Sequence, residues 1–180
     1  MTDDATPGGA DATNKMRTPR LAKVVVNIGV GEAGDKLIKA EKVLGMVTGR
    51  KPSRTVSRTT NRDFAIREGM PIGCRVTLRG PDAEKFVRTT LEVREKKIPA
   101  YAFDDGGNLN LGVTDYTEYP GQKYDPEIGI FGMDIAIVLE RAGNRVKRRR
   151  LLQRRVGRAH RLTRGEAMSF MRETFGIEVF

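Results

Sequence analysis

Three glycines, Gly29, Gly31 and Gly34, have the spacing of a phosphate-binding turn. In dinucleotide-binding proteins, Gly-x-Gly-x-x-Gly lets the backbone approach a pyrophosphate at the N-terminus of a helix. Here the glycines follow an apolar run, residues 24–28, and precede a helical pattern. The spacing therefore permits an NADP-dependent enzyme, but it also fits a tight strand-to-helix turn with no ligand. Asn27, a polar residue inside the apolar run, is a second candidate for ligand readout.

The residues after the glycines favour the turn. A dinucleotide-binding unit needs a second strand about 20 residues later that ends in Asp or Glu. Residues 49–55 are basic and poor in apolar side chains, although an arginine there could bind a 2′-phosphate. Strands of a parallel sheet are near-continuous apolar runs, and residues 53–57 do not form one. NADP chemistry remains only as an alternative.

Few other side chains could support catalysis. Cys74 is the only cysteine and His160 the only histidine, so an intramolecular disulfide and the usual zinc spacings are ruled out. His160 lies within an arginine-rich tract, and the adjacent Asp104 and Asp105 lie in a Gly-rich loop without a carboxylate partner. We therefore expect no catalytic residue, no metal and no cofactor.

The charge distribution points to a polyanionic partner. The formal net charge is +10, and residues 141–164 hold 11 of the 33 Lys and Arg residues with no Asp or Glu. The rest of the chain holds 22 basic against 23 acidic residues, so the excess positive charge belongs to this tract. Charge of this size typically marks a nucleic-acid partner. No apolar run reaches 18 residues and no signal pattern opens the chain, so we expect a cytoplasmic protein without a membrane partner.

Side chains that contact phosphates and sugars gather in three segments. These are residues 50–62, the outward face of residues 72–79, and the basic tract. Aromatic residues make up only 6% of the chain and form no paired stacking platform, which favours recognition of folded RNA by shape. Two alternatives stay open for the tract: a solvated, disordered tail, and the binding element of a non-specific basic RNA chaperone.

The elements that would position these residues can be read from periodicity. We expect strands at residues 21–30, 72–79, 109–113, 115–119 and 133–140, and helices at residues 35–48 and from Pro81 to about Lys97. Residues 53–67 fit two short strands or an exposed loop. Thr163-x-x-Glu166 is a capping box that opens a final short helix.

This pattern predicts an α+β fold: a mostly antiparallel sheet with helices packed on one face, plus a basic C-terminal extension. We expect residues 1–19 to be a mobile N-terminal tail and residues 20–140 to be the RNA-binding domain. Residues 141–180 would be a basic RNA-binding extension, with a short terminal helix, packed on the same domain.

Four motifs stand in order along the first half of the chain: Val-Asn27-Ile-Gly29-Val-Gly31-Glu32-Ala33, Thr48-Gly49-Arg50-Lys51-Pro52, Phe64-x-Ile66-Arg67-x-Gly69-x-Pro71-Ile72-Gly73 and Val76-Thr77-Leu78-Arg79-Gly80. They resemble the large-subunit ribosomal protein family number five, the universal 5S-rRNA-binding family. Two further motifs resemble the archaeal and eukaryotic branch: Tyr124-Asp125-Pro126-x-Ile128-Gly129-Ile130-x-Gly132-Met133-Asp134 and Arg145-Val146-x-x-Arg149. The resemblance covers residues 17–180.

The resemblance implies a non-enzymatic protein of the central protuberance that binds 5S rRNA and contacts the small-subunit head. Its partners would also include 23S-type large-subunit rRNA, P-site tRNA and neighbouring ribosomal proteins. The implied 5S rRNA face comprises Asn27, Arg50, Lys51, Thr77 and Arg79. Arg50 stands where the family usually has Gln, which exchanges an amide that donates and accepts for a donor only.

The resemblance places a tRNA-facing loop within residues 57–73. We assign to it Arg58, Asn61, Arg62 and Arg67. We assign phosphate contacts with rRNA to five arginines of the basic tract: Arg148, Arg149, Arg150, Arg154 and Arg155.

Overall fold

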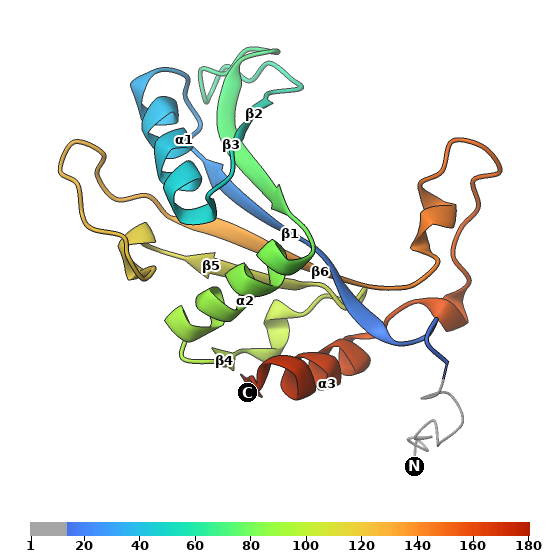
Figure 1. Ribbon diagram of the computed structural model, residues 1–180. Coiled ribbons are helices and arrows are strands. Elements are labelled where there is room, and N and C mark those ends of the chain that lie inside the picture. Colours follow the sequence, from blue (N-terminus) through green and yellow to red (C-terminus); the bar gives the residue numbers. More distant parts are fainter. Residues whose placement is uncertain (1–13) are drawn as a thin grey trace.

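The computed structural model describes residues 14–180, and its central feature is a five-stranded antiparallel sheet (Figure 1). The strand order is β2-β3-β1-β6-β5. The strands are β1 (Pro19–Gly29), β2 (Ser53–Val56), β3 (Pro71–Leu78), β5 (Leu109–Val113) and β6 (Met133–Arg141). Most of the tail expected at residues 1–19 lies outside the described residues.

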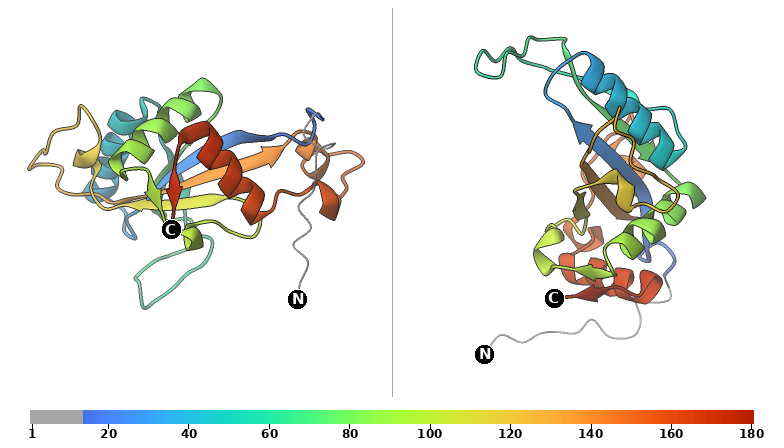
Figure 2. Two further views of the ribbon diagram at one scale, coloured as in Figure 1. Left: turned by 90° about the horizontal axis from the view of Figure 1, so that it is seen from below. Right: turned by 90° about the vertical axis from the view of Figure 1, so that its left-hand side faces the viewer.

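Three helices cover one face of this sheet (Figure 2). They are α1 (Asp35–Thr48), α2 (Pro81–Val93) and α3 (Arg164–Phe175). The core lies between the two layers. Val24, Val26 and Ile28 of β1 alternate inward, and the odd-numbered residues 133–139 of β6 do the same. The predicted α+β class, with helices on one face of an antiparallel sheet, is confirmed.

Helix ends follow local sequence signals. Gly49 ends α1 in the left-handed conformation, with φ of 63°, and its N–H donates to the carbonyl of Gly45. Pro81 occupies the first turn of α2, where a missing N–H costs nothing. The Thr163–Glu166 capping box is present at the start of α3. The prediction that the second helix reaches Lys97 was wrong. It ends at Val93 because Glu95 and Lys96 take positive φ values of 53° and 59°.

Residues 115–119 do not form the predicted strand. A 3₁₀ helix covers Tyr116–Glu118, because the Asp115 carboxylate accepts a hydrogen bond from the Thr117 N–H at 2.9 Å and closes a turn. Tyr116 and Tyr119, three residues apart, both point into the core, a spacing that suits this turn.

The C-terminus is tied to the domain by a pairing that periodicity does not show. β4 (Lys97–Ile98) and β7 (Glu178–Val179) form a parallel two-residue pair. The Phe180 N–H donates to Ile98, and the Ala100 N–H donates to Phe180. Short 3₁₀ helices also occur at Ala100–Ala102, Asn144–Lys147 and Arg158–His160.

Candidate nucleic-acid interface

The sheet face opposite the helices is not covered by any helix of the described chain (Figure 2). We call it the open face. Strand alternation assigns to it Lys23, Val25 and Asn27 of β1, Arg75 and Thr77 of β3, Ser53 and Thr55 of β2, Asn110 and Gly112 of β5, and Asp134, Ala136, Val138 and Glu140 of β6. The face thus combines small residues with hydroxyl, amide and charged groups, which a nucleic-acid backbone can approach closely.

Asn27 lies at the centre of the open face. In the strand register its neighbours are Arg75 on β3 and Asp134 on β6. Its side-chain amide makes no hydrogen bond within residues 14–180, so its donors and its acceptor are free for a ligand. The charge of the open face differs on the two sides of Asn27: basic side chains lie towards β2 and β3, and carboxylates lie on β6. A phosphate is therefore expected on the β3 side of Asn27.

An open hollow beside β3 brings together four of the five candidates for the 5S rRNA face. Arg50, Lys51, Thr77 and Arg79 line it. Asn27 does not, but its register neighbour Arg75 does. Among the lining residues outside the candidate set, Arg75 and Ser53 carry hydrogen-bond donors on the open face. The alternation of residues 72–79 already assigned Arg75 to the outward face, and Ser53 lies in the segment 50–62 that the sequence marked for phosphate contacts, although no motif singled it out.

Arg50 has an acidic partner inside the chain. Its guanidinium forms an ion pair with Asp82 in the first turn of α2. The hydrogen bond and the positive charge of Arg50 lower the pKa of the Asp82 carboxyl. Arg50 must therefore share its charge between Asp82 and any phosphate, whereas Arg79 has no ion-pair partner in the described part of the chain.

Residues 57–70 form a loop that projects from the sheet on its open-face side (Figure 2). Backbone hydrogen bonds close it at two levels, Ser57 with Met70 at the base and Asn61 with Ile66 near the tip. The Asn61 side chain accepts a hydrogen bond from the Asp63 N–H, so Asn61 shapes the loop. The other three candidates in this loop point into solvent: Arg58, Arg62 and Arg67. The segment 53–67 is thus one short strand followed by a structured loop.

A second projection, residues 142–160, leaves the end of β6 and returns to α3 (Figure 1). We call it the arm. Arg148 pairs with Glu140, and Arg149 donates from Nε to the carbonyl of Leu152 at 2.9 Å. Arg150, Arg154 and Arg155 are exposed, and their side chains have no partner among the described residues. These three are the freest phosphate ligands of the arm.

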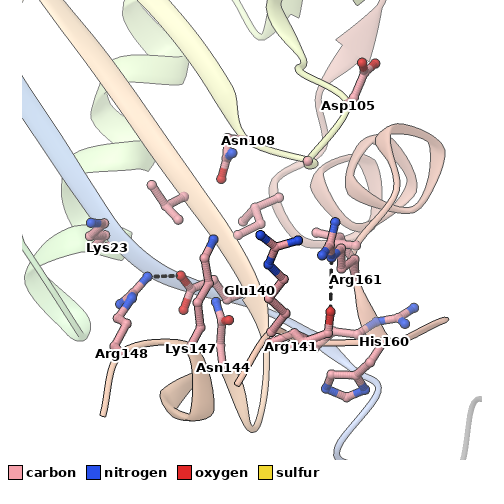
Figure 3. A pocket seen from close by; sticks show the side chains of 16 residues that line it. Lys23, Asp105, Asn108, Glu140, Arg141, Asn144, Lys147, Arg148, His160 and Arg161 are labelled. Atoms are coloured by element: carbon pink, nitrogen blue, oxygen red, sulfur yellow. Dashed lines mark hydrogen bonds and ion pairs between the residues drawn. The ribbon is translucent and has the colours of Figure 1, made fainter. Parts of the chain in front are cut away.

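The arm and the sheet enclose a basic hollow (Figure 3). Lys23, Arg141, Lys147, Arg148 and Arg161 line it, with the Arg148–Glu140 pair at one wall. His160 lies at its edge, and His160 Nε2 lies 2.8 Å from the carbonyl oxygen of Ala142. His160 therefore serves the structure of the arm base.

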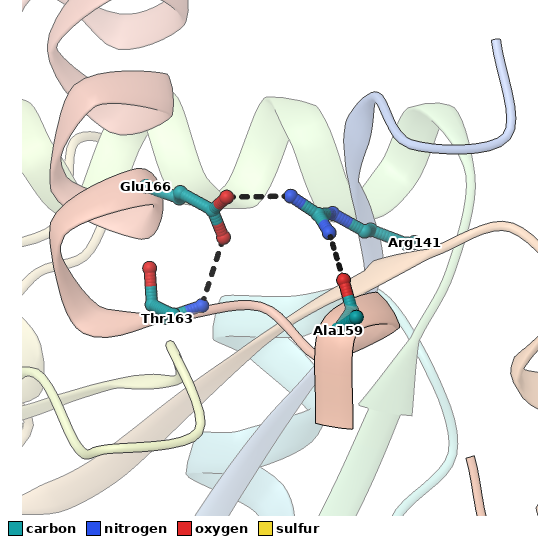
Figure 4. A network of polar contacts seen from close by, with 4 residues as sticks. All are labelled: Arg141, Ala159, Thr163 and Glu166. Atoms are coloured by element: carbon teal, nitrogen blue, oxygen red, sulfur yellow. Dashed lines mark hydrogen bonds and ion pairs between the residues drawn. The ribbon is translucent and has the colours of Figure 1, made fainter. Parts of the chain in front are cut away.

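Arg141 anchors the arm to α3 (Figure 4). Its Nη2 lies 2.6 Å from Glu166 Oε1, and its Nη1 donates to the carbonyl of Ala159 at 3.4 Å. The second oxygen of Glu166 accepts from the Thr163 N–H at 3.0 Å, which closes the capping box. One carboxylate thus caps the helix and holds the base of the arm.

Comparison with known proteins accounts for nearly all of this chain. The family profile "Ribosomal protein L5" matches residues 14–67, and the profile of the C-terminus of the same ribosomal family matches residues 71–170. The large ribosomal subunit protein uL5 of Thermoplasma volcanium is 48% identical over 167 residues, which cover 92% of this chain and 98% of the relative. The chain belongs to the ribosomal protein L5 family.

Two further L5-family relatives give the same picture. The uL5 proteins of Methanospirillum hungatei and Methanococcoides burtonii are 46% and 45% identical, over 92% and 93% of this chain and 99% of each relative. All three relatives are archaeal, in agreement with the branch that the Tyr124 and Arg145 motifs indicate.

Membership of the L5 family makes the chain a non-enzymatic ribosomal protein, and the sheet excludes the NADP alternative independently. β1 pairs antiparallel with both β3 and β6, so no parallel crossover follows Gly29, Gly31 and Gly34. Those glycines form the turn into α1, with φ of 81° at Gly31 and 118° at Gly34. Burial also raises the pKa of the Cys74 thiol to about 11, which leaves it a poor nucleophile at neutral pH. None of the helices within residues 14–180 is long and apolar enough to cross a membrane.

Proposed function

We propose that this L5-family protein is built into the large ribosomal subunit, where the open face binds 5S rRNA in the central protuberance. The observation that carries the proposal is the asymmetry of the sheet. One face is sealed by three helices, while the other presents Asn27, Thr77 and Arg75 on adjacent strands without a helix over them.

The chemistry of the open face suits folded RNA. Arg75, Arg79 and Lys51 supply charge for phosphates, and Ser53 and Thr77 supply hydroxyls for phosphate or sugar oxygens. Asn27 adds an amide that can both donate and accept, so it can distinguish one RNA group from another.

Two further contacts follow from the projections. We propose that residues 57–70 reach P-site tRNA through Arg58, Arg62 and Arg67, and that the arm binds 23S-type rRNA. The bridge to the small-subunit head and the contacts with neighbouring central-protuberance proteins rest on the family resemblance alone. Exchanging the three loop arginines for Gln should weaken tRNA crosslinking to assembled subunits while 5S rRNA content stays constant; unchanged crosslinking would remove the loop from the tRNA site.

The experiment that tests the main proposal is a salt series of binding to 5S rRNA and to an unrelated structured RNA of equal length. Each neutralised phosphate contributes a slope of about −0.7 to −0.9 in log K against log salt. If recognition is specific, the chain should still bind 5S rRNA more tightly than the unrelated RNA at high salt, where the attraction between basic side chains and phosphates is screened. If both curves fall together, the chain behaves as a non-specific basic RNA chaperone instead.

Asn27→Ala sharpens this test, with Asn110→Ala as the matched control on the same face. Loss of one or two polar contacts, about 1–2 kcal/mol, should lower affinity for 5S rRNA roughly 5- to 30-fold while the unrelated RNA is unaffected. Asn110 lies on β5, two strands away across the carboxylates of β6, and its loss should change little. Equal effects of Asn27→Ala on both RNAs would refute its role in readout.

A further inference from the structure

The tip of the arm exposes two leucines within the most basic part of the chain. The side chains of Leu151 and Leu152 are each 77% exposed. Arg148, Arg149 and Arg150 precede them, and Arg154 and Arg155 follow. Neither leucine takes part in the core, and no acidic residue occurs between positions 141 and 164. Packing within the chain therefore does not explain why apolar side chains stand here.

The turn at the tip holds the leucines outward. Arg149 Nε donates to the Leu152 carbonyl at 2.9 Å, and Gln153 Nε2 donates to the Lys147 carbonyl at 2.6 Å. The Arg154 N–H donates to Val146 at 3.2 Å and closes the arm. Leu152 has φ of +50°, a left-handed conformation that leucine seldom adopts. The tip is thus a structured turn with two apolar side chains at its apex.

Charge complementarity identifies what the tip meets. A cluster of arginines in a segment that has no acidic residue fits a polyanion, and an exposed apolar pair needs an apolar surface at the same place. Nucleic acid offers both within a few ångströms, because base faces and edges lie between rows of phosphates. Proteins that bind the minor groove of DNA use the same combination: an apolar side chain such as Leu inserts between two base steps, while Arg side chains contact the groove.

We propose that the arm tip is an apolar RNA wedge, in which Leu151 and Leu152 contact bases of large-subunit rRNA while Arg150, Arg154 and Arg155 bind the flanking phosphates. The inference rests on the proposed binding of the arm to 23S-type rRNA. It goes beyond that proposal because it assigns base contact, and not only charge neutralisation, to this tip.

The test compares three variants of the full-length protein on a large-subunit rRNA transcript across a salt series. The wedge variant combines Leu151→Ala with Leu152→Asn. Asn adopts the left-handed conformation more readily than other non-glycine residues, so the turn is kept while the apolar apex is removed. The charge variant combines Arg150→Gln with Arg155→Gln. Ile130→Ala is the matched control, since Ile130 is 65% exposed but lies between Glu127 and Asp134 in the sequence.

The wedge variant should bind the transcript about 5- to 20-fold more weakly at every salt concentration, with the salt slope unchanged, because the lost contact is apolar. The charge variant should reduce the slope by roughly 0.7–0.9 for each arginine removed. Ile130→Ala should match the parent. A wedge variant that binds within twofold of the parent overturns the proposal, and so does one that alters the slope.

Two outcomes separate this inference from the function proposed for the sheet. The wedge variant should keep its full affinity for 5S rRNA. Asn27→Ala should lose affinity for 5S rRNA but keep its affinity for the large-subunit rRNA transcript. If Asn27→Ala leaves the affinity for 5S rRNA unchanged while the wedge variant binds the transcript more weakly, the proposal for the sheet fails and the proposal for the arm tip stands. If the wedge variant binds the transcript normally but no longer joins reconstituted subunits, the tip meets a protein and the wedge is wrong.

Discussion

Single side chains of the basic surface fall into two classes, those with an acidic partner and those without. Arg50, Arg54 and Arg148 pair with Asp82, Glu41 and Glu140. Arg75, Arg79 and Arg150 have no such partner among the described residues. Solvent screens exposed ion pairs, so the first class can still exchange a carboxylate for a phosphate. The second class has nothing to exchange, and we expect it to dominate the affinity for RNA.

The buried polar pair in the core gives a prediction at this scale. Tyr119 stacks on Phe86 at 5.7 Å between ring centroids, and its hydroxyl lies 3.0 Å from Thr90 Oγ1. Burial raises the pKa of Tyr119 from 10.0 to about 12. Above pH 10 the unfolded tyrosine ionises while the folded one stays neutral, so the parent should lose about 1.4 kcal/mol of stability per pH unit up to pH 12.

Tyr119→Phe removes this dependence. At neutral pH the variant should be less stable by about 1 kcal/mol, because the hydrogen bond to Thr90 is lost. Between pH 10 and 12 this deficit should vanish and then reverse, because over two pH units the parent loses more stability than the hydrogen bond contributes. Urea unfolding at several pH values measures both effects, with Tyr101→Phe as the control because that side chain is 84% exposed. A deficit that stays constant from pH 8 to 12 would show that the folded and unfolded tyrosines ionise alike.

Helix α3 is the element on which the C-terminal part of the chain depends. Ala167, Met171 and Phe175 bury its inner face, and Glu166 joins its first turn to Arg141, whose side chain is only 10% exposed. The helix therefore belongs to the domain core although it follows the basic tract. We expect the orientation of the arm to depend on this one carboxylate.

Glu166→Gln and Glu166→Ala separate the two tasks of that carboxylate. Gln preserves the capping box but leaves Arg141 without a counter-charge, at a cost of about 1–2 kcal/mol given that Glu166 is partly exposed. Ala also removes the cap and should cost about 1 kcal/mol more. Glu173→Gln on the same helix is the control. Denaturant unfolding measures all three, and a Glu166→Gln protein as stable as the parent would show that the ion pair is dispensable.

The whole molecule is a platform with two projections. The helices support the sheet from one side, the open face lies on the other, and the loop 57–70 and the arm extend away from it (Figure 1). The tip of the arm, residues 147–153, can be removed without deleting buried residues. Deleting all of residues 141–180 would also remove the buried Met171 and the β7 strand, and would test the fold instead of the binding.

Replacing residues 147–153 with two glycines should therefore keep the fold, because the Arg154–Val146 hydrogen bond, where the tip joins the rest of the arm, lies outside the replaced residues. The replacement removes four basic residues, so the salt slope for any RNA should fall by at most about 3–4. The preference for 5S rRNA over an unrelated RNA should persist, since we propose that the sheet carries it. A variant that loses this preference would place specificity in the arm.

The faces of the strands follow from alternation, so they could be predicted before the structure was known. In residues 72–79 and 133–140 every second side chain is apolar, and the structure buries all of these except Ile72, which is half-buried at the start of β3. The capping box of α3 and the turn at Gly49 were equally readable, because each depends on residues within one helical turn. The strand predicted at residues 115–119 was wrong, because a short segment with two core tyrosines is compatible with both a strand and a 3₁₀ turn.

The sequence by itself therefore determined the α+β class, the two faces of each main strand, the concentration of charge in residues 141–164 and the resemblance to a ribosomal family. The tertiary structure decided which side chains are neighbours: Asn27 with Arg75 and Asp134, Arg50 with Asp82, and Arg141 with Glu166. The physical reason is range. Periodicity and caps are set by residues a few positions apart, whereas these neighbours are 25 to more than 100 positions apart and meet only when the whole core is packed.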